Sequence, residues 1–194
     1  AYIDVEESVK NPNKYILNNY QKTKDFVNFC ILNNHKKFIF SSTAAVYAGN
    51  SKKKVKENSI LKPISPYAIS KLKSEKFIMK IKNIDYIILR YFNVAGADIR
   101  LRSGLISKKK STHLIKKLCE NYLKIKEIKI FGSDYPSKDG TAIRDYIHVV
   151  DLALAHIYAA NYLNKNKSSL VLNCGYGHGY SVKEVIDSFN SLNK

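Results

Sequence analysis

The chain has 194 residues, of which 45% are apolar, and a formal net charge of +17. This length supports one large core or about one and a half domains. No run of residues approaches the roughly 18 to 20 apolar positions of a membrane helix, and the first residues, AYIDVEESV, lack the basic and apolar regions of a secretory signal. We therefore predict a globular cytoplasmic protein with no membrane partner.

Lysine supplies most of the positive charge, and the arginines are few: Arg90, Arg100, Arg102 and Arg144. Proteins that recognise phosphates and base edges favour arginine, because its planar guanidinium donates several hydrogen bonds in a fixed geometry. The lysines are spread among many Asn, Ile and Tyr residues, a mixture that an AT-rich genome produces without selection for a polyanion. We predict no nucleic-acid partner and keep a basic nucleic-acid-binding module as an alternative. The cysteines are scattered, which predicts neither a disulfide framework nor a metal site: Cys30, Cys119 and Cys174.

The first half of the chain alternates helix and strand patterns. Residues 1–8 show no turn and no preceding strand, so the chain is expected to begin in mid-fold. Apolar residues at helical spacing predict a helix from Pro12 to about Asn33, and KFIF with the residues up to Thr43 predicts a buried parallel strand. Residues 48–62 are predicted to form a surface loop. Ser65 and Pro66 give the start signal of a helix over 67–81, and IDYIILRYF (84–92) predicts a central strand.

The second half continues the alternation. After a loop over 99–111 we predict a helix at 113–123, a strand at 127–131 closed by Gly132, and a turn-rich segment. A short strand from residue 145 then leads into an Ala- and Leu-rich helix, followed by a buried strand at 169–174. Ser181 and Glu184 have the spacing of a capping box, which predicts a last helix. Strands that alternate with helices indicate an α/β fold with a mostly parallel sheet.

Tyr67 and Lys71 lie four residues apart in SPYAISK, so on a helix they face the same way. A free Tyr has a pKa near 10, whereas a general base should titrate near the working pH. An opposite charge within about 4 to 6 Å typically moves a pKa by 1 to 3 units, so Lys71 could favour the phenolate of Tyr67. Thr43, at the end of the preceding strand, could relay a proton or hold a substrate oxygen. The alternative is an exposed helix face, because Y-x-x-x-K alone is a weak pattern.

Five stretches in order carry a family resemblance: FIFSSTAAVY, SPYAISK, LRYFNVAGA, IKIFGSDYPSKDGTAIRDYIHVVDLA and LNCGYGHGYSV. Through them the chain resembles the extended short-chain dehydrogenase/reductase family, and within it the UDP-hexose 4-epimerases. The resemblance implies a Rossmann-type, doubly wound parallel sheet that holds NAD, lacking its first βαβ unit, and part of a smaller substrate-binding domain. Residues 1–95 would belong to the NAD-binding domain and 96–194 to the nucleotide-sugar-binding domain, with the strand near 169–173 returning to the first sheet.

The same resemblance implies roles for individual residues. Tyr67 would be the catalytic acid/base at the sugar 4-hydroxyl, Lys71 would bind the nicotinamide ribose, and Thr43 would contact the reacting hydroxyl. These three would also contact the cofactor, together with Asn18, Ser41 and Phe92. The resemblance also implies that Thr43 and Tyr67 contact the UDP-hexose substrate. Five further residues match substrate-binding positions of the family: Asn93, His113, Leu114, Phe131 and Arg144. For His113 the alternative is a solvent-facing residue at a helix start, and for Arg144 it is an ion pair with Asp145 or Asp139.

Two departures from the family pattern bear on these expectations. A glycine-rich dinucleotide fingerprint is absent from the start of the chain, so we predict an internal fragment of a longer enzyme. Gly175, Gly177 and Gly179 have the wrong spacing to replace this fingerprint, and we predict a short strand-to-helix loop at these glycines. Dehydratases of this family usually carry an acidic pair directly after the Thr, where this chain has Ala44 and Ala45. This favours epimerisation of UDP-glucose and UDP-galactose; a 4,6-dehydratase, another nucleotide-sugar epimerase or an inactive fragment remain alternatives. A homodimer is a further possibility.

Overall fold

The computed structural model describes residues 1–47, 54–106, 112–122, 128–166 and 168–192. The chain divides into two compact units. The first contains residues 1–92 and 154–174, and the second contains residues 93–153 and 175–194. The division at residues 95 and 96 that the sequence suggested stays a prediction.

A parallel sheet forms the centre of the first unit. Its strands are β1 (Lys37–Thr43), β2 (Asp85–Tyr91) and β5 (Leu170–Cys174), in the order β1-β2-β5. The prediction of a central strand at 84–92 is therefore confirmed. The register pairs Thr43 with Tyr91 and Tyr91 with Cys174, so the carboxyl ends of the three strands lie at the same edge of the sheet. Open α/β sheets place their ligands at this edge.

The helix predicted from Pro12 to Asn33 is interrupted in the structure. It consists of α2 (Pro12–Tyr15), a π-helical turn η1 (Ile16–Gln21) and α3 (Lys22–Leu32). A short helix that the sequence reading missed, α1 (Val5–Lys10), precedes it and is capped by the side chain of Asp4, which accepts from the Glu7 amide at 2.9 Å. The acidic residues of its first turn complement the helix dipole and were the available signal.

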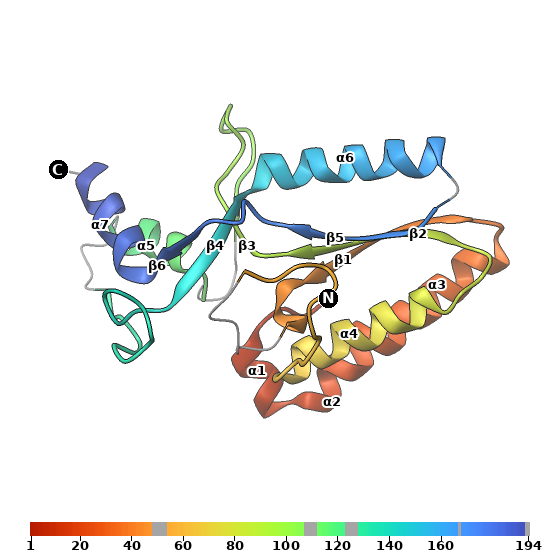
Figure 1. Cartoon of the computed structure of the whole chain (residues 1–194), viewed down its shortest axis with the longest axis horizontal. Helices are drawn as coiled ribbons and strands as arrows, with labels where there is room; N and C mark the ends of the chain where they lie inside the picture. Colours follow the sequence, from red (N-terminus) through yellow and green to blue (C-terminus); the bar gives the residue numbers. More distant parts are fainter. Residues whose placement is uncertain (48–53, 107–111, 123–127, 167, 193–194) are drawn as a thin grey trace. The chain divides into compact units, whose positions relative to one another are not determined.

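The helix predicted at 67–81 is confirmed as α4 (Pro66–Met79), and it packs with α3 against one face of the first sheet (Figure 1). Ser65 caps it, since its hydroxyl accepts from the Ala68 amide at 3.2 Å, and proline occupies the first helical position. The end of α6 (Val149–Lys165) that belongs to this unit covers the other face (Figure 1). Helices on both faces of a parallel sheet confirm the predicted doubly wound α/β architecture.

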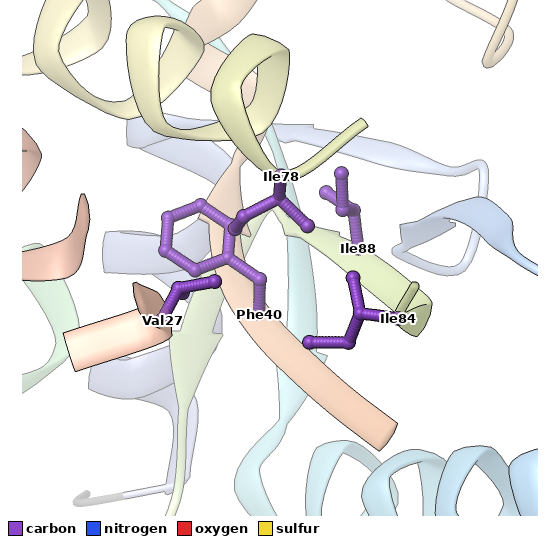
Figure 2. Close-up of a cluster of buried hydrophobic side chains, with 5 residues drawn as sticks. All are labelled: Val27, Phe40, Ile78, Ile84 and Ile88. Atoms are coloured by element: carbon purple, nitrogen blue, oxygen red, sulfur yellow. The ribbon is translucent and has the colours of Figure 1, made fainter. Parts of the chain in front are cut away.

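An apolar cluster joins α3, α4 and the sheet. Figure 2 shows its five buried members, with Ile78 between the Phe40 ring and Ile88 and with Val27 and Ile84 on either side of Phe40. These side chains are each at most 7% exposed. At about 25 cal/mol per Å² of apolar surface removed from water, such burial is the main force that seats α4 on β1 and β2. The cluster therefore fixes the helix that carries Tyr67 and Lys71.

The segment predicted as a surface loop at 48–62 falls partly outside the described residues, at 48–53. Its described part packs on the first unit: Val55 and Leu61 contact a small cluster of Val46, Tyr47 and Leu72. Leu61 also forms a β-bridge with Tyr47, which follows the 3₁₀ turn η2 (Ala44–Val46). Residues 54–62 are otherwise mostly exposed, as predicted for a surface loop, and Val55 and Leu61 anchor them beside the carboxyl end of β1.

The second unit contains a small mixed sheet. β3 (Asn93–Ala95) pairs in parallel with β4 (Ile143–His148), which pairs in antiparallel fashion with β6 (Gly179–Ser181). β3 and β6 were not predicted, and Gly179 lies in a strand instead of the expected loop. The strand expected at 127–131 is also wrong where it can be compared, because residues 128–131 form no strand, whereas Glu127 lies outside the described residues.

Among the described residues, the remaining helices are α5 (Leu114–Tyr122) and α7 (Val182–Leu192). α5 was predicted at 113–123, and Leu123 lies outside the described residues. The predicted capping box is confirmed: the Glu184 amide donates to the Ser181 hydroxyl at 3.0 Å, and the Ser181 amide donates to the Glu184 carboxylate at 2.7 Å. Among the described helices, none combines the length and the apolar character needed to cross a membrane.

Candidate active site

Tyr67 lies in the first turn of α4, next to the carboxyl end of β1. Its hydroxyl forms a hydrogen bond with the side chain of Thr43, the last residue of β1. Burial raises the pKa of Tyr67 above its usual value, and the hydrogen bond with Thr43 opposes this shift. The Thr43 hydroxyl also accepts from the Ala45 amide at 3.2 Å, which fixes its position. The structure thus brings together two of the three residues predicted to be catalytic.

Lys71 is one turn further along α4 and only 6% exposed. Its ammonium donates to the main-chain carbonyl of Ser41 and lies 4.3 Å from the centroid of the Phe40 ring. Burial lowers the pKa of Lys71 to about 8, and the Glu75 carboxylate opposes this shift. The effect of Lys71 on the pKa of Tyr67 stays a prediction, because burial dominates the Tyr67 shift and the ammonium is directed at β1.

A buried polar network beneath this pair was missed by the sequence reading. Glu75 is fully buried and Arg90 is 2% exposed. Arg90 donates to the Glu75 carboxylate from Nη2 at 2.7 Å and from Nε at 3.1 and 3.2 Å, and the Ser42 hydroxyl donates to the same carboxylate. Arg90 Nη1 also donates to the Tyr47 hydroxyl at 2.7 Å and to the Glu57 carbonyl at 3.1 Å. The available signal was an arginine in an otherwise apolar central strand, which requires a partner.

Asn18 lies on η1, the π-helical turn that packs against α4. Its side-chain amide donates to Asn19 Oδ1 at 3.1 Å. Asn19 is buried and bridges three segments: it exchanges hydrogen bonds with the main chain of Tyr2 at 2.7 and 2.8 Å and donates to Ser70 at 3.2 Å. The predicted cofactor residue Asn18 is therefore positioned by a neighbour that the sequence reading did not single out.

The other predicted cofactor residues lie at the ends of β1 and β2. The exposed Ser41 hydroxyl accepts from Tyr91 at 2.7 Å, and the Tyr91 hydroxyl also lies 2.6 Å from Nε2 of His156 on α6. Phe92 is half-buried, and its amide donates to the Cys174 carbonyl at 3.1 Å, which extends the pairing of β2 with β5. The carboxyl edge of the first sheet thus brings together five of the predicted cofactor residues: Ser41, Thr43, Tyr67, Lys71 and Phe92.

The residues predicted to contact only the substrate lie in the second unit. Asn93 begins β3, and His113 and Leu114 lie at the start of α5. The exposed Phe131 ring contacts the same helix, because Lys117 Nζ lies 5.8 Å from its centroid. Whether these residues and Tyr67 bind one ligand stays a prediction.

Arg144, on β4, is exposed, and its Nη1 donates to the Ile143 carbonyl at 2.8 Å. Both proposed ionic partners are engaged elsewhere. Asp145 accepts from the amides of Tyr176 and Gly177 at 3.0 and 2.7 Å, and Asp139 binds the side chains of Thr141 and Ser181. Within the described ranges, Arg144 has no ion pair with either aspartate. The geometry therefore leaves the guanidinium fork available to an anionic ligand.

The described residues contain no group of three or more His, Cys, Asp or Glu side chains arranged to hold a metal ion. The donors gathered at the sheet edge are instead hydroxyls and one ammonium. Such groups bind the hydroxyls of a sugar or ribose and exchange protons with them.

Comparison with known proteins decides between the possible families. The model of the NAD dependent epimerase/dehydratase family matches residues 1–175. The chain belongs to this family. The UDP-glucose 4-epimerase of Azospirillum brasilense is 42% identical over 194 residues, which cover 98% of this chain and 56% of that protein. That of Halalkalibacterium halodurans is 42% identical over 187 residues, which cover 94% of this chain and 56% of that protein.

Solved structures of family members agree with the fold. The UDP-glucose 4-epimerase of Brucella ovis in complex with NAD is 35% identical, with a TM-score of 0.91, and the match covers 97% of this chain and 59% of that one. The UDP-glucose 4-epimerase of Stenotrophomonas maltophila, with bound NAD and formylated UDP-arabinopyranose, is 32% identical, with a TM-score of 0.94. The match covers 98% of this chain and 58% of that one. The predicted Rossmann-type fold is confirmed. The chain spans less than two thirds of the length of these relatives.

Proposed function

We propose that the protein acts as an NAD-dependent UDP-hexose 4-epimerase that interconverts UDP-glucose and UDP-galactose. One observation supports this most directly. At the carboxyl end of the sheet, the Tyr67 hydroxyl is hydrogen-bonded to Thr43 on β1, and Lys71 follows one helical turn later. This is the arrangement that a proton transfer at a sugar hydroxyl requires, in a chain related to named UDP-glucose 4-epimerases.

Tyr67 would exchange the proton of the sugar 4-hydroxyl. As a phenolate it would take this proton while C4 is oxidised, and it would return the proton after the 4-keto sugar has rotated. Thr43, bound to the same phenol oxygen, would hold the reacting hydroxyl in line with it. Burial alone raises the pKa of Tyr67 and disfavours the phenolate. A positive charge nearby has the opposite effect, and Lys71 supplies one on the same face of α4.

The donor set fits the nicotinamide ribose of NAD. The Lys71 ammonium, the Tyr67 phenol and the Thr43 hydroxyl can bind neighbouring hydroxyls, while Ser41 and Phe92 line the same strand ends. NAD, when bound, supplies the chemistry by accepting a hydride from C4 and giving it back to the opposite face. The chain's own residues then orient the sugar and move its proton. Arg144 is the proposed partner of the diphosphate, because a planar guanidinium suits phosphate oxygens.

A nucleotide-sugar dehydratase is the second candidate, because the matching family includes dehydratases. Elimination of water needs an additional acid and base. In this chain the two residues after Thr43 are Ala44 and Ala45, at the start of the 3₁₀ turn η2. Neither side chain can transfer a proton, which favours epimerisation.

The deciding experiment is the interconversion of UDP-glucose and UDP-galactose by the purified protein with added NAD. We expect Tyr67→Phe to lower kcat by about 10² to 10⁴, the usual contribution of a positioned acid/base. Tyr158→Phe, at an exposed tyrosine of α6, is the matched control and should leave kcat unchanged. A fully active Tyr67→Phe protein would reject the role of Tyr67, and formation of a 4-keto-6-deoxy sugar would favour the dehydratase. Failure of the wild-type protein to turn over either sugar would favour the inactive alternative.

We further propose that the enzyme works in the cytoplasm, where its three unpaired cysteines would stay reduced. Its partner would be the nucleotide sugar and not a nucleic acid, because its basic residues are mostly lysines spread along the chain. A homodimer stays a prediction, which light scattering of the purified protein would test.

A further inference from the structure

Two successive turns of α4 are tied to two adjacent residues of β1. The Lys71 ammonium donates to the Ser41 carbonyl, and the Ser42 hydroxyl donates to the Glu75 carboxylate. Tyr67, Lys71 and Glu75 are spaced by four residues, so they follow one stripe of the helix. The stripe thus begins with the proposed acid/base, continues with the proposed ribose ligand and ends with a buried carboxylate to which the proposed reaction assigns no role.

Glu75 is held by side chains of both neighbouring strands, Ser42 on β1 and Arg90 on β2. Arg90 on β2 contacts both of its carboxylate oxygens, and Arg90 is in turn held by the Tyr47 hydroxyl and the Glu57 carbonyl. Among the described residues, no buried side-chain N or O atom lacks a hydrogen-bond partner. A buried charge network that is fully satisfied is rigid, whereas an apolar pair of similar volume would stabilise the fold at least as well. The stability of the fold alone therefore does not explain why this network is charged.

We propose that Glu75 is a positioning residue for Lys71: its carboxylate, oriented by Arg90 and Ser42 one helical turn away, keeps the Lys71 ammonium charged where the Ser41 carbonyl holds it, at the end of β1. There the ammonium can bind the ribose of the cofactor and act on Tyr67. This inference rests on the proposed function for its catalytic meaning, but the charge state of Lys71 can be measured without it. In agreement, the carboxylate of Glu75 raises the pKa of Lys71, against the larger effect of burial.

The other titratable groups on elements that pack against α4 have partners of their own. On α1 and α2, Glu7 binds Lys14 and Tyr15. On η1 and α3, Tyr20 lies under Lys73 at 5.9 Å, and Asp25 accepts from Gln21 at 2.9 Å. On β1 and β2, Lys37, Asp85 and Tyr86 lie at the amino ends of the strands, away from Lys71, and the Tyr91 hydroxyl donates to Ser41 at 2.7 Å. Arg90 on β2 and Tyr47, which follows η2, belong to the network itself. Glu75 is thus the carboxylate that lies one turn from Lys71 on the same stripe of α4.

The test is the titration of Lys71 by NMR, in protein labelled with ¹³C at lysine Cε and with the Lys71 signal assigned by its loss in Lys71→Arg. In Glu75→Gln we expect the titration midpoint of Lys71 to fall by one pKa unit or more, about a tenfold loss of proton affinity. Glu6→Gln is the matched control, because Glu6 pairs with Lys10 at the same four-residue spacing on the exposed face of α1. It should leave the Lys71 midpoint in place.

If Glu75→Gln does not fold, Glu75→Asp gives a second readout, because it keeps the charge and moves it away from Lys71 by one methylene, so the Lys71 midpoint should fall by less than in Glu75→Gln but still measurably. A Lys71 midpoint that is unchanged in the folded variant would overturn the proposal. In an active enzyme, the alkaline limb of the kcat profile should move to lower pH by the same amount as the Lys71 midpoint. A wild-type protein without epimerase activity would reject the proposed function, while the NMR titration would still decide whether Glu75 controls Lys71.

Discussion

The molecule contains two arginine–carboxylate pairs of similar geometry in very different surroundings. In the first unit, Arg90 Nη2 lies 2.7 Å from Glu75 Oε2, and the two side chains are 3% and 0% exposed. In the second unit, Arg102 Nε lies 2.6 Å from Asp98 Oδ2, with the side chains 69% and 17% exposed. The N–O distances of the two pairs are nearly equal, so on distance alone both pairs would be expected to contribute equally to stability. Their burial predicts that only the first matters to folding and function.

The difference follows from the cost of taking charges out of water. A buried charge loses its hydration, so its partner becomes indispensable, whereas an exposed charge is solvated with or without its partner. The buried pair also joins α4 to β2 and therefore links separate elements of the candidate site. The exposed pair joins residues four apart, between β3 and the residues that precede α5. Sequence separation and burial together mark the pair around which the site is organised.

The largest effect should come from breaking the buried pair at one side. Arg90→Leu leaves Glu75 buried with only the Ser42 hydroxyl as a side-chain donor, so we expect the free energy of unfolding to fall by about 3 to 5 kcal/mol. Urea unfolding followed by circular dichroism measures this loss. The control is the double variant Arg90→Leu with Glu75→Met, which removes both charges and should recover most of the lost stability. If the double variant is as unstable as the single one, lost packing and not the unpaired charge explains the effect.

The second effect concerns pH and arises from Lys71. Its folded pKa, about 8, lies below the value of an unfolded lysine, about 10.4. Between these two values the unfolded chain binds the proton that the folded chain has released. The contribution of Lys71 to stability is therefore unfavourable at neutral pH, and stability increases as the pH rises from about 8 to about 10.4.

Comparison with Lys71→Met isolates this contribution from the other lysines and tyrosines that titrate in the same range. The unfolding free energy of the wild type, measured relative to that of Lys71→Met, should rise between pH 8 and 10.4 by up to a value on the order of 3 kcal/mol. The measurement is a series of urea unfolding curves across this range. A constant difference between the two proteins would mean that Lys71 keeps an ordinary pKa in the folded state.

The part of the site that was predictable from the sequence depends on local rules. The spacing of Tyr67 and Lys71 on one helical face follows from helix geometry, and the start of that helix follows from the Ser65 and Pro66 signal. The position of the polar residues at the end of β1 was predictable because they directly follow an apolar run typical of a buried strand. The three strands of the first sheet and the helix α4 required no more than hydrophobic periodicity, which explains why the α/β class and the central position of β2 were correct.

The missed features depend on contacts between distant segments. The π-helical turn η1 has the same apolar spacing as an ordinary helix, but its Asn19 carbonyl also accepts from the hydroxyls of Ser74 and Thr23 at 2.9 and 2.7 Å. The Glu75–Arg90 pair needs the register of α4 on the sheet, which no local pattern contains. Short strands such as β3 and β6 depend on pairing with β4 for their existence. Tertiary context overrides local preference at each of these places.

A smaller effect should follow from removing one hydrogen bond of the buried network without removing a charge. Ser42→Ala deletes the hydroxyl that donates to Glu75, while Arg90 continues to hold the carboxylate. A hydrogen bond to a charged group contributes about 1.5 to 3 kcal/mol, and we expect the lower end of this range because Arg90 remains. The loss is measured by urea unfolding. Ser42→Thr is the control, since it keeps the hydroxyl; a loss as large as that of Ser42→Ala would point to packing instead.

The smallest effect is expected at the exposed pair. In Arg102→Ala, Asp98 keeps its access to water, so its charge stays hydrated and no buried group is left without a partner. The urea midpoint should therefore remain within experimental error of the wild type, and so should the activity if the protein is an epimerase. Added salt offers a second comparison, because screening acts on exposed charges and hardly reaches buried ones. High salt should leave the effect of Arg90→Leu nearly unchanged. A marked loss of stability in Arg102→Ala would show that burial is not what separates the two pairs, and that the short geometry common to both is sufficient.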